Sequence, residues 1–157
     1  QVDDMDLLIE KHGMKLMEHA ADTINACLNE SLRKEEVATP VGIGKYALVL
    51  QATSAFKANI LATRLQQAIS GVSFELSGEA IQINLAIGIT STESPEKAAQ
   101  ILTFGEYCIQ AQHALNMSLE YRNNRVVRFD ETYEKIVKSE SSVTPDTEVK
   151  VGWKWIF

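Results

Sequence analysis

The sequence predicts an α+β domain in which helices cover a mainly antiparallel β-sheet. Helical and strand patterns follow one another in the order helix, hairpin, helix, hairpin, helix, strand. The strands come mostly in pairs joined by short glycine-containing turns, which makes neighbouring strands antiparallel. A chain of 157 residues suits one such domain with a hydrophobic core and leaves little room for a second.

The first half of the chain predicts a helix, a hairpin and a second helix. Residues 5–32 read as helix, broken at Gly13, because apolar residues recur at three- and four-residue spacing. Residues 37–51 predict a β-hairpin with Gly42 and Gly44 in its turn. Ser54 is the expected N-cap of a helix over residues 55–69. The expected inward-facing residues of the two helices are Leu7, Leu8, Leu16, Met17, Ala20, Ala21, Ile24, Cys27 and Leu28, and Phe56, Ile60, Leu61, Leu65 and Ile69.

The second half predicts another hairpin, a long helix and short terminal elements. Residues 72–76 and 80–90 alternate apolar and polar side chains around Ser77 and Gly78, as two paired strands do. Pro95 suits the first turn of a helix that continues over residues 96–120. Residues 125–129 predict a strand, and residues 131–138 a helix. The last ten residues, EVKVGWKWIF, alternate strictly and predict a final strand.

Composition and charge exclude several classes of function. A net charge of −6 argues against a general binder of nucleic acid or anionic membrane, since both require a basic surface. No apolar run reaches the ~20 residues of a membrane span. We therefore expect a cytoplasmic location. The larger protein to which the segment belongs can itself be membrane-associated. Cys27 and Cys108 are expected to be reduced, mostly buried thiols. His12 and His19 lie ~10 Å apart along a helix, too far to share one metal.

Four segments, in the right order, resemble the GGDEF domain, the family of diguanylate cyclases that make cyclic di-GMP from two GTP molecules. GMKLMEHAADTINACL is similar to the helix that carries the family's GDxLL motif, and GIGKY falls in the hairpin turn where the signature belongs. NLAIGIT resembles the family's SIGIA strand, and ALNMSLEYRNNRVV aligns with ALYxAKxxGRNRVV. The resemblance predicts a degenerate GGDEF-like domain over residues 1–130, followed by a helix-and-strand extension over residues 131–157.

The signature turn departs from the family where metal chemistry requires an anion. Its five positions are Gly42, Ile43, Gly44, Lys45 and Tyr46. The resemblance implies a carboxylate at the fourth position that helps to hold the divalent cations bridging the GTP phosphates. Lys45 places an ammonium there, which repels a metal ion. The two glycines have a simpler explanation, because a tight turn favours residues that tolerate a positive φ.

The positions that the resemblance assigns to guanine and phosphate are also replaced. Met5 and Met14 stand where the family has the Asn and Asp that read the guanine, and a thioether cannot supply that pairing. Val2, Leu119 and Asn123 stand where it has cations for the triphosphate. We therefore expect no cyclase activity, no catalytic residue, no metal and no cofactor.

One family feature is partly kept. Many diguanylate cyclases bind their product at an inhibitory RxxD site just before the signature, and the aligned residues here are Arg33 and Glu36. An Arg contact and a longer carboxylate remain chemically able to hold cyclic di-GMP. The simpler interpretation is a charged helix end in solvent.

These observations predict a catalytically inactive regulatory or scaffolding domain of a bacterial signalling protein. Its expected partner is another protein, a neighbouring domain or a second copy of itself, and the alternative is a cyclic di-GMP sensor that uses Arg33 and Glu36. The resemblance also implies a central strand before Met5, which this chain does not show. Either residues 148–157 or a strand of another chain occupies that place, or the strand lies upstream of Gln1. For an interaction surface, the first residues to consider are Trp153, Trp155 and Phe157.

Overall fold

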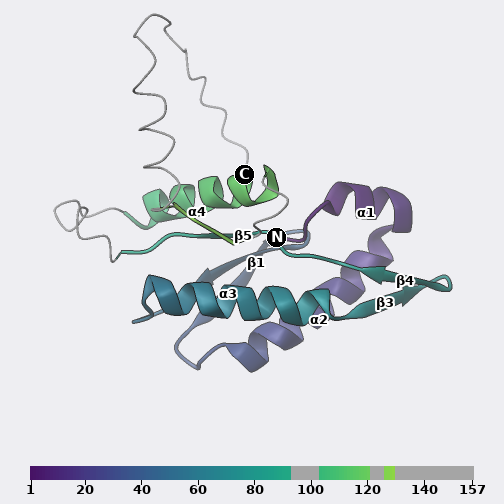
Figure 1. Ribbon diagram of the computed structural model, residues 1–157, viewed down its shortest axis with the longest axis horizontal. Helices are drawn as coiled ribbons and strands as arrows, with labels where there is room; N and C mark the ends of the chain where they lie inside the picture. The colour runs from purple at the N-terminus through teal and green to yellow at the C-terminus, as the bar shows by residue number, and fades with distance from the viewer. Residues whose placement is uncertain (93–102, 121–125, 130–157) are drawn as a thin grey trace, which may run out of the picture.

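The computed structural model describes residues 1–92, 103–120 and 126–129, and these form an α+β fold (Figure 1). The predicted fold class is therefore confirmed. The helix predicted over residues 96–120 begins at Phe104, because the described residue before it, Thr103, is not helical. Residues 96–102, the helix over residues 131–138 and the strand over residues 148–157 lie outside the described residues. The division of the chain at residue 130 remains a prediction for the same reason.

The first long helical pattern forms two helices that meet at Gly13, as predicted. Helix α1 spans Met5–His12 and helix α2 spans Met14–Ser31. Gly13 has a φ of 76°, a left-handed value that favours glycine, and its N–H donates to Ile9 O at 2.8 Å. The α2 side chains that pack into the core are Leu16, Met17, Ala20, Ile24 and Leu28. The prediction for Leu7 was wrong, because its side chain is 61% exposed.

A hairpin and a third helix follow. Strands β1 (Val37–Gly42) and β2 (Lys45–Val49) pair antiparallel, and helix α3 spans Ala55–Ser70. The predicted cap is present, since Ser54 Oγ accepts from Lys57 N at 3.3 Å. Phe56 and Ile60 were expected to face inward but are exposed. They extend the apolar stripe of α3 beyond the surface that its neighbouring elements cover.

The predicted strand over residues 80–90 is two strands in different sheets. Strands β3 (Ser73–Leu76) and β4 (Glu79–Gln82) form the second hairpin, with Ser77 and Gly78 both at positive φ in its turn. Strand β5 (Ile87–Ile89) pairs instead with strand β6 (Val126–Arg128), in parallel. Between β4 and β5, residues 84–86 form hydrogen bonds with the first three residues of the chain. Alternating apolar residues continue through this change of partner, so the pattern could not reveal it.

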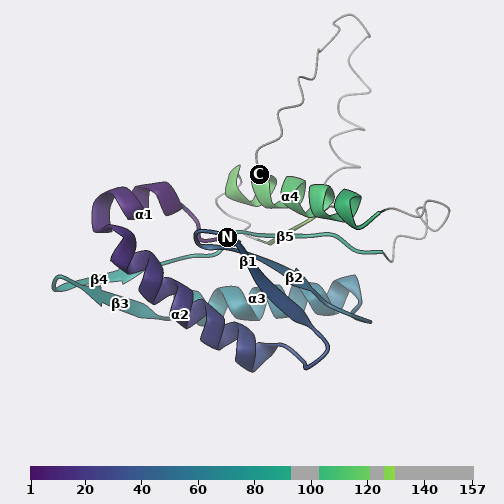
Figure 2. The ribbon, with the colours of Figure 1, turned by 180° about the vertical axis from the view of Figure 1, so that it is seen from behind.

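Helix α4 (Phe104–Glu120) packs on β5 and β6, while α3 packs on the same two strands from the other side (Figures 1 and 2). The described strands thus form three two-stranded sheets, of which two are antiparallel and one is parallel. The main core lies between α2, α3 and the strands, with Val2, Leu16, Ile69 and Ile83 almost completely buried. A smaller cluster of Ala114, Met117 and Val127 joins α4 to β6.

One buried hydroxyl links α4 to β5. Ser118 is 2% exposed, and its Oγ accepts a hydrogen bond from Ile87 N at 3.2 Å. We expect Ser118→Ala to lower the free energy of unfolding by about 1–3 kcal/mol, because the Ile87 N–H loses this acceptor inside the fold. Urea unfolding followed by circular dichroism measures the change. Ser70→Ala is the control, since that hydroxyl bonds only to its own helix, at Gln67 O.

Candidate functional site

The predicted signature residues span the end of β1, the turn of the first hairpin and the start of β2. Gly44 has a φ of 60°, and its carbonyl accepts from Val2 N at 2.8 Å. A Cβ at Gly44 would lie 2.9 Å from Met17 Cε and 3.2 Å from Met5 Sδ, so the turn is pressed against α1 and α2. Gly42 differs on both counts, since its φ is not positive and a Cβ added there would meet Lys45 Cβ at the ordinary contact distance of 3.7 Å. The backbone therefore requires glycine at position 44 and not at position 42.

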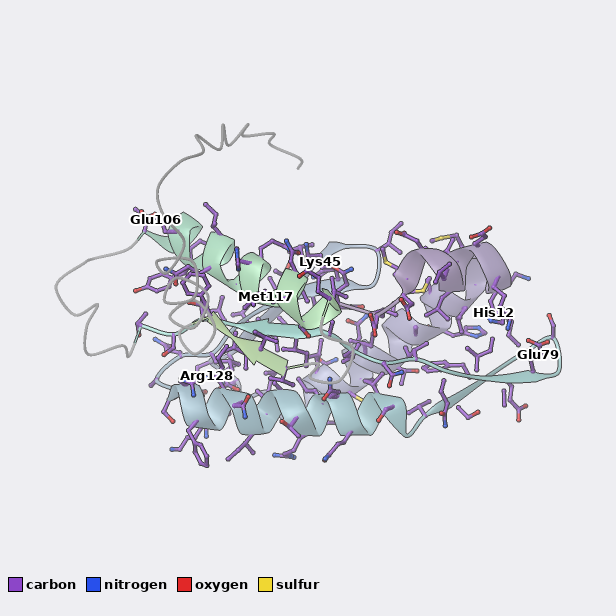
Figure 3. The ribbon with its side chains drawn as sticks, turned by 45° about the horizontal axis from the view of Figure 1, so that its top comes forward. His12, Lys45, Glu79, Glu106, Met117 and Arg128 are labelled. Atoms are coloured by element: carbon purple, nitrogen blue, oxygen red, sulfur yellow. The ribbon has the colours of Figure 1, made fainter. Side chains whose placement is uncertain are left out.

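Lys45 is half-buried and points from the turn to helix α4 (Figure 3). Its Nζ donates a hydrogen bond to Gln112 Oε1, and Gln112 Nε2 donates in turn to Asn116 Oδ1 at 2.8 Å. The ammonium thus interacts with a neutral amide that α4 holds in place. This contact fixes the end of the hairpin against α4. Sequence reasoning missed Gln112, since nothing marks it among the polar residues of that helix.

The first three residues lie between the turn and the segment before β5. Val2 pairs antiparallel with Leu85, Asp3 N donates to Asn84 O at 2.8 Å, and Ala86 N donates to Gln1 O at 2.9 Å. The Gln1 amino group donates to Ala86 O at 2.9 Å. Burial, together with the positive charge of Lys45, lowers the pKa of this amino group to about 6. The first three residues thus connect this end of the hairpin to the segment before β5.

Two of the other aligned positions lie against this turn. Val2 is completely buried in the main core, and Met5 is half-buried beside Gly44. Met14 is further away at the exposed start of α2, Leu119 is half-buried on α4, and Asn123 lies outside the described residues. Among the residues that the structure describes, no three His, Cys, Asp or Glu side chains gather as a metal site would require. The turn packs against Val2 and Met5 at Gly44, while Gly42 and Ile43 are exposed.

Arg33 and Glu36 lie in the loop between α2 and β1. Glu36 Oε2 accepts from Arg33 N at 2.9 Å, and Glu36 Oε1 accepts from Thr53 Oγ1 at 3.2 Å. The carboxylate is therefore half-buried and used within its own loop, while the Arg33 side chain is exposed. A ligand that needs both side chains would have to draw Glu36 away from these donors.

A shallow groove of about 410 Å³ opens elsewhere, between α1 and β4. His12 and Glu79 line it from facing sides, at a distance from Lys45 (Figure 3). The exposed side chain of Leu7 forms part of its apolar wall. None of the predicted site residues lines this groove.

Solved structures with the same fold are GGDEF domains. The GGDEF domain of DgcB from Caulobacter crescentus, in complex with c-di-GMP, matches with a TM-score of 0.71 at 14% identity, over 82% of this chain and 74% of that one. The diguanylate cyclase SiaD from Pseudomonas aeruginosa, in complex with its activator SiaC, matches with a TM-score of 0.68 at 18% identity. The match covers 82% of this chain and 47% of the SiaD chain. The FimX GGDEF domain from the same species matches with a TM-score of 0.68 at 15% identity. The match covers 81% of this chain and 75% of the FimX chain.

This chain therefore has the fold of a GGDEF domain, and the resemblance found in its sequence is confirmed at the level of fold. No protein-family model matches the sequence, and no curated protein matches it either. In the parts of the chain that the structure describes, no helix combines the length and the apolar character that crossing a bilayer requires.

Proposed function

We propose that this chain is a catalytically inactive GGDEF-like domain that regulates or scaffolds a bacterial signalling protein through contacts with another protein. The observation that carries the proposal is the position of Lys45. Its ammonium points from the fourth signature position to Gln112, where a metal-binding domain would need a carboxylate. The buried Val2 and the thioether of Met5 line the same turn.

The loss of activity follows from charge. Phosphoryl transfer depends on cations that neutralise the triphosphate and on an anionic site that holds the metal. At this turn the charge is reversed, because the Lys45 ammonium would repel Mg²⁺. The methionines offer no hydrogen-bond donor to a guanine edge.

An exposed apolar surface supports a role in protein contacts. Val37 and Val49 lie directly opposite each other on the β1–β2 hairpin and are 56% and 48% exposed. Thr39 and Ala47, the next pair on the same face, are exposed as well. Apolar surface of this kind marks interaction sites. SiaD, which shares the fold, is known in complex with a protein activator, and we propose a protein partner here too.

The first prediction concerns activity. Incubated with GTP and Mg²⁺, the purified chain is expected to form no cyclic di-GMP above a protein-free blank, measured by liquid chromatography and mass spectrometry. Lys45→Glu restores one carboxylate but none of the base or phosphate contacts, so we expect that variant to be inactive as well. Turnover by the unchanged chain would overturn the proposal.

The second candidate is a cyclic di-GMP sensor. The DgcB domain is known in complex with c-di-GMP, and Arg33 is exposed at the aligned position in this chain. Calorimetric titration with cyclic di-GMP separates the candidates. A scaffold gives no heat of binding, whereas a sensor binds and loses binding in Arg33→Ala. Lys34→Ala, which changes the exposed neighbour, is the matched control.

A further inference from the structure

Strand β4 has one edge that no described strand pairs with. On its other side β4 pairs with β3, in a hairpin whose turn has two residues. A turn of this length makes Leu76 and Glu79, which flank it, a hydrogen-bonded pair, and such pairs recur at every second residue of an antiparallel ladder. Ile81 therefore also bonds to β3. The N–H and C=O groups of Ala80 and Gln82 point the other way.

The start of the chain shows what lies on that side. Asn84, two positions after Gln82, accepts through its carbonyl from Asp3 N at 2.8 Å. Because the hydrogen-bonding groups of a strand alternate in direction, Ala80 and Gln82 point to the same side as Asn84. After Asp3 the chain forms α1 instead of continuing along β4, so this pairing ends before Gln82. The groove of about 410 Å³ between α1 and β4 therefore runs along the unpaired edge, and we call it the α1–β4 groove.

The outward backbone groups of Ala80 and Gln82 are available for pairing. Within residues 1–92, 103–120 and 126–129, no other group bonds to them. Strand β4 contains no proline, which would remove a donor from the edge. Such an edge is the template to which an extended peptide adds as a further strand. The groove is small, so the added strand would be only a few residues long.

Helix α1 supplies apolar side chains at the centre of the groove. Leu7 is exposed and Leu8 is half-buried, and both line the groove opposite β4. A few backbone hydrogen bonds contribute little net affinity, because they replace hydrogen bonds to water. An apolar side chain of the added strand that covers Leu7 would contribute more. The groove therefore favours a segment with an apolar residue at its centre.

The two ends of the groove differ in charge. Asp4 lies at the start of α1, beside the C-terminal end of β4. At the other end Glu79 lies opposite His12 (Figure 3), and Lys11 adds a positive charge there. Carboxylate and ammonium balance at this second end, whereas Asp4 leaves a negative charge at the first. The first end therefore favours a basic side chain.

We propose that the α1–β4 groove binds an extended segment of a partner protein, which adds as a strand to the edge of β4. The segment runs antiparallel to β4, which is the more stable pairing, so its N-terminal side lies beside Asp4. It carries a lysine or arginine there and an apolar residue two positions later, which contacts Leu7. This inference rests on the proposed function, because it names the surface and the kind of protein contact through which an inactive domain would act.

Nuclear magnetic resonance on the full chain tests the proposal with one defined probe, the acetylated and amidated peptide TKTVTTT. We expect the amide signals of Ala80 and Gln82 to shift as peptide is added, and their exchange with solvent to slow several-fold. The amides of Glu79 and Ile81 already bond to β3, so their exchange should stay unchanged. Equal slowing of all four amides, or shifts confined to another surface, would overturn the proposal.

A substitution in α1 tests the apolar contact. Leu7→Asp should weaken binding of TKTVTTT at least tenfold, and the exposed position of Leu7 means that the core is not disturbed. Val49→Asp is the matched control, since it changes another exposed apolar residue, on β2, and should leave the affinity unchanged. Equal affinity of the two variants would refute the groove as the binding site.

A second peptide tests the charge. TETVTTT should bind several-fold more weakly than TKTVTTT, because its glutamate would lie beside Asp4. Asp4→Asn should remove this difference, and asparagine tolerates the left-handed backbone that Asp4 adopts, with a φ of 49°. A preference for lysine that survives Asp4→Asn would overturn the assigned direction of the segment.

These results separate the groove from the proposed function. If the peptide has no effect on a chain that forms no cyclic di-GMP, the groove is refuted and the proposal of an inactive domain stands. If the chain forms cyclic di-GMP, that proposal is overturned whatever the peptide does.

Discussion

Gly88→Ala is expected to lower the free energy of unfolding by more than about 3 kcal/mol, or to prevent folding. A Cβ on Gly88 would overlap the backbone of α4, at Ala111 O and Leu115 N, and would lie 2.7 Å from Leu115 Cα. These atoms belong to the helix itself and cannot move aside as a flexible side chain can. Helix α4 would have to lift from β5 and lose the packing of Ala114 and Leu115.

Gly78→Ala is the matched control for this substitution. Gly78 has a φ of 84°, but a Cβ there would meet no atom within 4 Å. That variant should cost only about 1–2 kcal/mol, the penalty of a left-handed conformation for alanine. Urea unfolding of both variants, followed by far-ultraviolet circular dichroism, compares them. A Gly88→Ala domain as stable as the Gly78→Ala domain would show that α4 does not approach β5 as closely as described.

Local chemistry explains which elements the sequence could predict. Ser54 caps α3 through its own side chain, Gly13 ends α1, and Ser77 with Gly78 closes the second hairpin. Each of these signals acts within a few residues of its element. The boundaries of α1, α2, α3 and the first hairpin therefore lie close to the predicted ones, and so does the turn of the second hairpin.

The sequence did not predict which distant segments pair with each other. In the run from residue 80 to residue 90, every second residue from Ile81 to Ile89 is apolar, yet the first half of the run pairs with β3 and the second half with β6. Pairing of β5 with β6 depends on the chain returning from α4, and pairing of residues 84–86 depends on Gln1–Asp3. Phe56 and Ile60 show the same limit for helices, since periodicity marks an apolar stripe but not how far a neighbour covers it.

The same distinction between local information and tertiary contacts applies to the candidate site. The identity of Lys45 already predicted that a metal would be repelled, because charge belongs to the residue type. Its partner Gln112 and the inward turn of Glu36 toward Arg33 N depend on tertiary contacts. The proposal of an inactive domain rests on the residue type at position 45. The assessment of the sensor alternative rests on the tertiary contacts of Glu36.

Gly44→Ala is expected to lower the free energy of unfolding by about 1–3 kcal/mol with no nucleotide present. The positive φ accounts for about 1–2 kcal/mol, and the rest comes mainly from crowding against Val2 Cβ, 3.3 Å away, because the ends of the Met17 and Met5 side chains can move aside. Thermal and urea unfolding measure the effect. A glycine retained only for a ligand would show no such dependence.

Gly42→Ala separates the two explanations for the signature glycines. Gly42 lies in β1 without a positive φ and is exposed, so alanine there should change stability by no more than about 0.5 kcal/mol. If both variants keep the stability of the unchanged chain, the turn does not press against the two helices as described. If only Gly44→Ala is destabilised, one glycine of this signature is required by packing alone. The presence of that glycine then says nothing about catalysis.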